Sequence, residues 1–193
     1  EVVEQVWHIG GMYSEALEQI VYWLEKAEKV ANPAQREYIR SLIEYYKTGD
    51  LKLFDEYNIA WVKDTESNVD FVNGFIESYG DPLGRKASWE SVVNFRDVEA
   101  CKRTEIMAAN AQWFEDNAPI NPAYRKKEVK GVSAKVITVA MLGGDCYPAT
   151  AIGINLPNAD WIRKEHGSKS VTIDNITYAY AKAAEGNGFS EEF

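Results

Sequence analysis

The chain has 193 residues, of which 46% are hydrophobic and 12% are aromatic, a composition that is typical of a globular protein and excludes a disordered one. Its net charge of −9, from 21 basic and 30 acidic residues, repels phosphate backbones, so we expect no nucleic acid partner. No apolar run approaches the roughly 20 residues that a membrane-spanning helix needs, so we expect no membrane partner.

The two cysteines, Cys101 and Cys146, are too few and too far apart for a disulfide framework or a zinc knuckle. We therefore expect reduced thiols in a cytoplasmic protein. The length fits one domain or two unequal lobes. The chain begins at Glu1 with no signal peptide, which we interpret as the start of a processed or truncated protein.

The first sixty residues are expected to be helical. Apolar residues recur at helical spacing over residues 13–24 and again over residues 39–46. Between these segments Asn32-Pro33 supplies an N-cap followed by proline at the first helical position. Gly49 ends the second helix, and Asp50 caps a third, short one. The pattern predicts antiparallel helices joined by short connections.

Strand patterns begin after these helices. Residues 59–62 have a strand-like composition, and residues 69–79 predict a second strand that pairs back on the first across a polar turn. Residues 91–95 are a further strand candidate, and a helix follows from about residue 97 to residue 118. Residues 135–142 are β-branched and nearly all apolar, which predicts a buried strand.

The last part of the chain alternates between helix and strand patterns. We expect a short helix around residues 161–162, a strand at residues 170–173 and a helix through residues 178–183. The whole pattern predicts an α+β fold in which helices pack with a small, mainly antiparallel sheet.

Two motifs stand out from this background. Residues 73–84 read Asn-Gly-Phe-Ile-Glu-Ser-Tyr-Gly-Asp-Pro-Leu-Gly, and residues 153–158 read Gly-Ile-Asn-Leu-Pro-Asn. Together they resemble the dipeptidyl peptidase III family of zinc-dependent exopeptidases, whose members carry closely similar segments in the substrate cleft. The resemblance runs from the region of Gly10 to the C-terminus. It implies a two-lobed peptidase whose lower lobe contains a β-barrel, of which this chain would form part.

The resemblance also implies how the chain is divided. Residues 1–90 correspond to lower-lobe helices and the first barrel strands, and residues 91–134 to a helical segment of the upper lobe. Residues 135–146 correspond to a strand that returns to the barrel. Residues 147–193 correspond to a second upper-lobe segment, which contains the Asn-x-Pro-Asn motif.

The zinc-binding motif of the family, His-Glu-x-x-Gly-His, does not occur in this sequence. The chain contains two histidines, His8 and His166, far apart and without metal-ligand spacing. In relatives the motif lies downstream of the Asn-x-Pro-Asn segment. We therefore expect a peptidase fragment that binds no zinc and holds no catalytic residue, whereas the full-length enzyme uses zinc. Its partners would be an oligopeptide substrate and the remainder of the same polypeptide. The alternative is a non-catalytic peptide-binding or scaffold protein.

Asn155 and Asn158 are the first candidates for a binding site. An asparagine amide offers a donor and an acceptor, which suits it to a peptide group or a free amino terminus. The residue before proline is pushed out of the helical region, so residues 153–157 are expected to be extended and able to pair with a peptide as an added strand. The alternative role for Asn158 is to cap a helix that starts at residues 159–160.

The resemblance implies more specific roles. Both asparagines correspond to residues that bind the amino-terminal end of the substrate. Asp160 corresponds to an acid that influences substrate preference, although it would also stabilise the first turn of a helix. Asp70 corresponds to a glutamate that holds the substrate's ammonium group, a role that needs a charge-assisted acceptor. Val72 departs from the family pattern, because relatives carry a tyrosine there. We interpret the neighbouring Glu77 as mostly structural.

Overall fold

The computed structural model describes residues 5–79, 81, 83, 87–129 and 132–186, with the side chains of residues 132–134 excepted. It divides the chain into two compact units. The first unit comprises Glu1–Ser67 and Ala159–His166, and the second comprises Asn68–Asn158 and Gly167–Phe193. Among the helices within the described ranges, none combines the length and the apolar character that a bilayer crossing requires.

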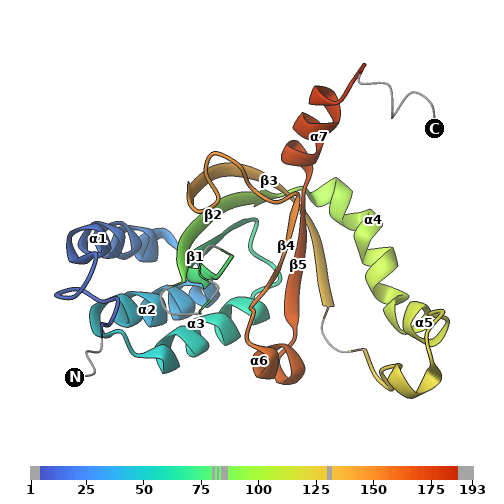
Figure 1. Ribbon diagram of the computed structural model, residues 1–193, viewed down its shortest axis with the longest axis horizontal. Coiled ribbons are helices and arrows are strands. Elements are labelled where there is room, and N and C mark those ends of the chain that lie inside the picture. Colours follow the sequence, from blue (N-terminus) through green and yellow to red (C-terminus); the bar gives the residue numbers. More distant parts are fainter. Residues whose placement is uncertain (1–4, 80, 82, 84–86, 130–131, 187–193) are drawn as a thin grey trace. The chain divides into compact units, whose positions relative to one another are not determined.

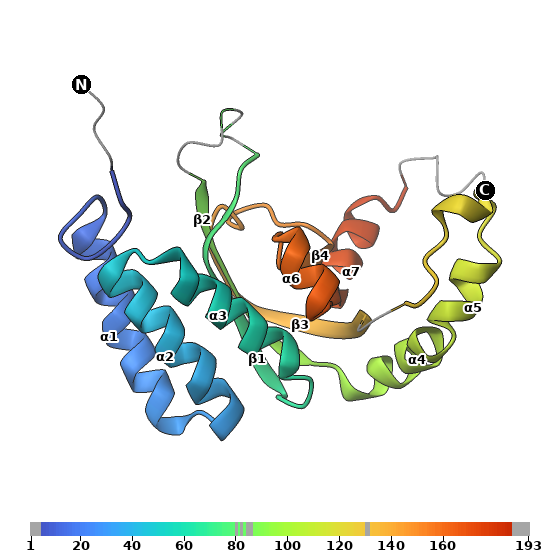
Figure 2. The same cartoon turned by 90° about the horizontal axis from the view of Figure 1, so that it is seen from below.

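The first unit is helical. It consists of α1 (Ser14–Val30), α2 (Pro33–Thr48), α3 (Leu51–Lys63) and the short α6 (Asp160–Glu165). The first three helices lie side by side, with α2 between α1 and α3, and α6 packs against α3 (Figures 1 and 2).

The boundaries of α2 follow from its end residues. The Asn32 side chain accepts a hydrogen bond from the backbone nitrogen of Gln35 at 2.9 Å, and the Gln35 side chain accepts one from the backbone nitrogen of Asn32. This reciprocal pair satisfies two of the donors that a helix start leaves free. Gly49 ends the helix in the left-handed conformation, at φ 75°. The predicted cap, proline position and stop are all confirmed.

The helices of this unit meet through aromatic and aliphatic side chains. Tyr38 and Tyr46 of α2 and Tyr57 of α3 are at most 1% exposed. The predicted strand at residues 59–62 is wrong, because these residues form the last turns of α3. Tyr57 and Trp61 are four positions apart and both are buried, so packing against α2 overrides the local strand preference.

The second unit is built on a five-stranded sheet. Its strands are β1 (Val69–Glu77), β2 (Ser88–Arg96), β3 (Val132–Gly144), β4 (Gly153–Leu156) and β5 (Ser168–Ile173). The strand order is β1-β2-β3-β5-β4, and the sheet is open (Figure 1). Three of the pairings are antiparallel, and β3 with β5 is parallel. The predicted α+β class with a mainly antiparallel sheet is confirmed.

The strand pairing differs from expectation at β1. This strand pairs with β2, Asp70 facing Asn94, and not with residues 59–62. Gly80 and Pro82, between β1 and β2 in the sequence, lie outside the described residues. β2 also spans the expected lobe boundary at residue 90. The assignment of segments to an upper and a lower lobe stays a prediction.

The helices of the second unit are α4 (Val98–Ala109), α5 (Ala111–Asp116) and α7 (Asp174–Ala183), with a short 3-10 helix at Pro122–Tyr124. α4 and α7 both contact β3. α4 places Ala100 and Cys101 against Val136 in a small buried cluster. Figure 2 shows that α5 continues the course of α4.

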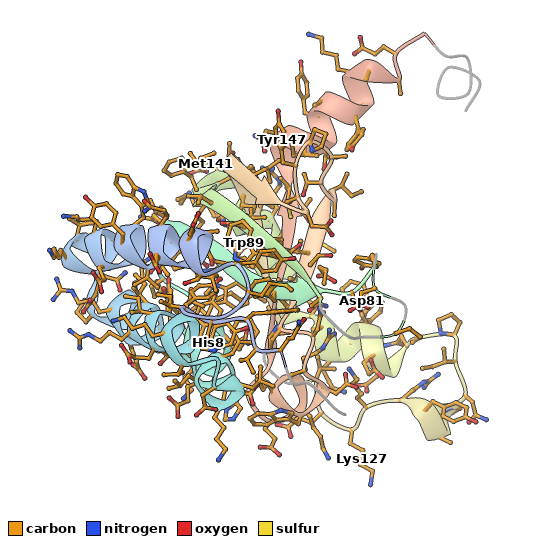
Figure 3. The ribbon with its side chains drawn as sticks, turned by 60° about the vertical axis from the view of Figure 1, so that its left-hand side comes forward. His8, Asp81, Trp89, Lys127, Met141 and Tyr147 are labelled. Carbon is orange, nitrogen blue, oxygen red and sulfur yellow. The ribbon has the colours of Figure 1, made fainter. Side chains whose placement is uncertain are left out.

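Two predictions need correction here. The helix expected over residues 97–118 is divided at Asn110, whose side-chain nitrogen donates to the carbonyl of Ile106 at 2.7 Å and so competes with the regular helical pattern. The strand over residues 135–142 forms as predicted but is buried over residues 135–137 and not throughout. Met141, near its other end, is 67% exposed (Figure 3).

Candidate functional site

A cavity of about 410 Å³ lies in the second unit. It is lined from the ends of β1 and β2, from the loop that follows β3, and from β4 with the residues just after it. Its polar lining includes Asn155, Asn158, Glu77, Glu90 and Asp145. The volume falls within the range of small-molecule ligand pockets. The cavity therefore combines two predicted binding residues with three carboxyl groups.

The turn after β3 is held by Trp89. Glu90 faces Gly144 in the β2–β3 register, and the backbone nitrogen of Asp145 donates to the carbonyl oxygen of Trp89 at 2.9 Å. Gly144 has φ 60°, and a Cβ there would overlap the backbone and the ring of Trp89 (labelled in Figure 3). Glycine is therefore required, and the tight approach brings Cys146 beside Glu90.

Glu90 is a buried acid in this cavity, with 6% of its surface exposed. The thiol of Cys146 donates to Oε2 of Glu90 at 3.3 Å. Burial raises the pKa of the Glu90 carboxyl above its ordinary value, and the negative charges of Glu77 and Asp145 raise it further, against the lowering effect of the thiol hydrogen bond. Burial, followed by the charge of Glu90, raises the pKa of Cys146 to about 12. The thiol therefore stays protonated at neutral pH and remains a donor.

Asn155 belongs to β4, where it pairs with Ser170 of β5. The expected extended conformation of residues 153–156 is confirmed by this pairing. β4 is at one end of the strand order, so among the described strands its outer edge has no strand partner. An added peptide strand could pair there while the Asn155 side chain faces the same cavity.

Asn158 connects the two edge strands of the sheet. Its side-chain nitrogen donates to the carbonyl oxygen of Ile76, in β1, at 3.3 Å. With this nitrogen engaged, the amide presents its oxygen as an acceptor. The alternative role as a helix cap is wrong, because the N-cap of α6 is Ala159 and no side chain caps that helix.

Asp70 lies elsewhere in the second unit and is not among the described residues that line the cavity. Its Oδ2 accepts a hydrogen bond from Nζ of Lys169 at 2.9 Å, and its Oδ1 accepts one from the backbone nitrogen of Phe71 at 2.8 Å. The side chains of Asp70 and Lys169 are 13% and 1% exposed. The charge of Asp70 is therefore balanced within the chain.

Asp160 is the first residue of α6 and belongs to the first unit, where it supplies the acid of the first helical turn. Val72 is 3% exposed within β1. The structure thus brings Asn155 and Asn158 into one cavity and places Asp70 and Asp160 outside it. The roles that the family resemblance implies for these four residues stay predictions.

Three residues described above were not singled out from the sequence as site residues: Glu90 and Cys146 in the cavity, and Lys169 beside Asp70. A signal for Glu90 was nevertheless present. Along β2 the residues Glu90, Val92 and Asn94 alternate with more exposed neighbours, and all three are buried. An acid in phase with a buried valine is an unusual choice for a strand and marks a candidate site. Glu77, interpreted as structural, also lines the cavity.

The described residues do not fit a zinc site. Within the ranges that the structure covers, no group of three or more His, Cys, Asp or Glu side chains is arranged to hold a metal ion. Both histidines belong to the first unit, and Nδ1 of His8 lies 2.6 Å from the carbonyl oxygen of Ile9.

Comparison with known proteins identifies the relatives of this chain. Dipeptidyl peptidase 3 of Rattus norvegicus is 30% identical over 184 residues, a match that covers 94% of this chain and 24% of the relative. Dipeptidyl peptidase 3 of Homo sapiens is also 30% identical over 184 residues, covering 94% of this chain and 25% of the relative. The chain therefore spans about a quarter of the length of these relatives.

The fold agrees with these matches. The solved structure of DPP III from Caldithrix abyssi superimposes with a TM-score of 0.75 and 27% sequence identity, over 88% of this chain and 33% of that one. A model of Peptidase family M49 matches residues 3–192. Because this match covers nearly the whole sequence, the chain belongs to peptidase family M49.

Proposed function

We propose that this chain is the substrate-binding portion of a zinc-dependent exopeptidase that releases dipeptides from the amino termini of oligopeptides. The observation that carries the proposal is that Asn155 and Asn158 line one cavity beside the edge strand β4. The strand edge offers backbone groups to an extended peptide, and the two amides offer acceptors to its first residues.

The chemistry of peptide hydrolysis belongs to the rest of the polypeptide in this proposal. The described residues hold no set of metal ligands, and the chain covers about a quarter of its relatives. Zinc bound elsewhere would activate the attacking water. This chain binds and orients the peptide, and it is inactive when it is separated from the zinc-binding part. Its two cysteines are free thiols, which supports a cytoplasmic location.

The test uses the complete open reading frame that contains this chain. We expect the full-length protein to hold zinc and to release dipeptides from a tetrapeptide with a free amino terminus, but not from the same peptide after N-acetylation. The 193-residue chain alone should bind no stoichiometric zinc and should cleave neither peptide.

The alternative is a non-catalytic peptide-binding or scaffold protein, and the same experiment separates the two. An open reading frame that ends without a His-Glu-x-x-Gly-His segment, with no dipeptide release, contradicts the peptidase proposal. Peptide binding would then be the remaining function of the cavity.

A further inference from the structure

Helix α1 carries two parallel apolar stripes. The first contains its buried side chains, Leu17, Val21 and Leu24, and α1 packs against α2. The second lies about 100° from the first around the helix axis and repeats at spacings of four and three residues. It consists of Ala16, Ile20, Trp23, Ala27 and Val30, which we call the α1 seam. The apolar face of α1 is therefore wider than the part that its buried side chains occupy.

The α1 seam is largely open to solvent. Trp23 and Val30 are 66% and 88% exposed. Ala16 is also exposed, whereas Ile20 and Ala27 are half-buried. Figure 2 shows α1 at the outside of the row of three helices. Apolar side chains in line along one helix differ from the scattered ones that a protein surface normally carries. The α1 seam thus has the character of a surface that another element covers.

The spacing of the α1 seam indicates a helix as the covering element. Spacings that alternate between four and three residues have an average period of 3.5, which is typical of two helices that pack side by side. The small side chains of Ala16 and Ala27 lie two turns before Trp23 and one turn after it, and they leave room for large side chains of a partner. Tryptophan is enriched among the residues that anchor the centre of an interface. An amphipathic helix with large apolar side chains fits this surface.

The size of the α1 seam indicates where such a helix comes from. From Ala16 to Val30 the seam is about 21 Å long, and a helix is about 10 Å wide. This footprint is well below the roughly 800 Å² per partner that stable complexes of separate proteins bury. A helix of the same polypeptide needs less contact area, because its effective concentration is on the order of millimolar.

The comparisons indicate that such a helix lies beyond this chain. Within the 193 residues, the longest stretch outside the described ranges is 187–193, which is less than half the length of the seam. The chain covers 24% of the relative from Rattus norvegicus and 33% of the solved structure from Caldithrix abyssi. Members of the family therefore contain further segments that can supply a helix.

We propose that the α1 seam is the docking surface for an amphipathic helix from a part of the same polypeptide outside these 193 residues, with Trp23 at the centre of the contact. The inference rests on the proposed function, in which this chain is one portion of a longer exopeptidase. It gives α1 a role separate from the substrate cavity, which is to join the helical first unit to the rest of the enzyme.

The experiment measures how fast a maleimide labels single cysteines at two neighbouring positions of α1. Val30→Cys lies in the α1 seam. Lys29→Cys is the matched control, because Lys29 is exposed on the same turn but points away from the seam. Both variants should fold, since both side chains are on the surface. Mapping of the labelled peptides by mass spectrometry separates these sites from all other cysteines.

In the 193-residue chain the two introduced cysteines should react at similar rates. In the full-length protein Val30→Cys should react at least about tenfold more slowly than in the 193-residue chain, because labelling then requires the covering helix to open. Lys29→Cys should keep its rate. Trp23→Ala should lower the urea midpoint of the full-length protein but not that of the 193-residue chain.

Two results would overturn the proposal. One is equal labelling of Val30→Cys in the 193-residue chain and in the full-length protein, since no helix then covers the seam. The other is protection in the 193-residue chain that increases with protein concentration, which would assign the seam to a second copy of this chain.

Zinc content and dipeptide release are measured on the same full-length samples. A protein that releases dipeptides while Val30→Cys stays accessible contradicts the docking proposal alone. A protein that protects Val30→Cys without dipeptide release contradicts the peptidase proposal alone.

Discussion

Lys169 of β5 donates a hydrogen bond to Asp70 of β1 at 2.9 Å across 99 residues of sequence. Their strands are not neighbours, since β2 and β3 lie between them in the strand order. Both side chains lie within the sheet unit and are largely withdrawn from solvent. The pair therefore ties the first strand of the sheet to the last along the chain.

Lys169→Met should destabilise the fold strongly. The substitution keeps the bulk of the side chain but leaves the Asp70 carboxylate buried without its cation, which costs roughly 3–5 kcal/mol of unfolding free energy. Urea denaturation measures the effect. Lys102→Met, in an ion pair whose side chains are 62% and 78% exposed, is the control and should change stability by less than about 0.5 kcal/mol.

The double variant Asp70→Asn with Lys169→Met tests the reason for that loss. Removing both charges leaves no uncompensated ion, so the double variant should be more stable than Lys169→Met alone. If the two substitutions simply add, the pair is not energetically coupled and its burial has another cause.

Glu90 should make the fold less stable as the pH rises. Its pKa is raised in the folded state, so the folded chain binds more protons than the unfolded chain in the interval between the ordinary glutamate pKa and the raised one. Stability contributed by the neutral carboxyl is present below this interval and is lost as the pH increases through it. Denaturation curves measured from mildly acidic to neutral pH give the slope.

Glu90→Gln isolates this effect. The amide cannot ionise, so the variant should lose the component of the slope that Glu90 contributes and should equal or exceed the original chain in stability at neutral pH. The slopes of the two proteins are subtracted, which cancels the contributions of all other carboxyl groups. Equal slopes would show that Glu90 titrates alike in the folded and unfolded chains.

Gly144→Ala should disturb the turn that holds Cys146 beside Glu90. The backbone has φ 60° there, and the new Cβ would meet Trp89. We expect a loss of about 1–3 kcal/mol, with altered tryptophan fluorescence. Gly186→Ala is the matched control, because its φ is also positive, at 77°, while its Cβ would meet nothing within 4 Å. If Gly186→Ala destabilises the fold as much as Gly144→Ala does, then backbone strain, and not the contact with Trp89, causes the loss of stability.

Asn155→Ala in the full-length protein should reduce kcat/KM for unblocked peptides by about ten- to a hundredfold, because groups of the bound peptide lose their partner. Zinc content should stay unchanged, since the described part of the chain offers no ligand set. The kcat/KM measured with an N-acetylated peptide provides the baseline for this comparison. Unaltered turnover by this variant would remove Asn155 from the proposed site.

An apolar surface on α4 and α5 should make the isolated chain bind hydrophobic dyes and self-associate. Ile106, Met107, Trp113 and Phe114 are 52% to 68% exposed and line a shallow depression. Such a patch is typical of a surface that another segment covers. Trp113→Lys should lower dye binding and shift sedimentation toward the monomer, whereas Leu51→Lys, at an exposed residue of α3, should not.

The local features of this fold could be predicted from sequence because their physical causes lie within a few residues. Asn32 reaches the backbone of Gln35, Gly49 adopts a conformation that other residues avoid, and proline at residue 157 keeps the preceding segment extended. The same holds for the two motifs, whose order along the chain was enough to indicate the family. The second motif contains Asn155 and Asn158, whose binding roles stay predictions.

Tertiary structure decided the features that depend on distant partners. Residues 59–62 have strand-like composition, yet the buried face that they share with Tyr57 makes them helical. Asp70 has an ion-pair partner that no local pattern indicated, because β5 places Lys169 against it. Glu90 meets Cys146 because the turn after β3 folds over Trp89. Charge pairing acts through space, so its partners depend on strand order and register, which no local pattern specifies.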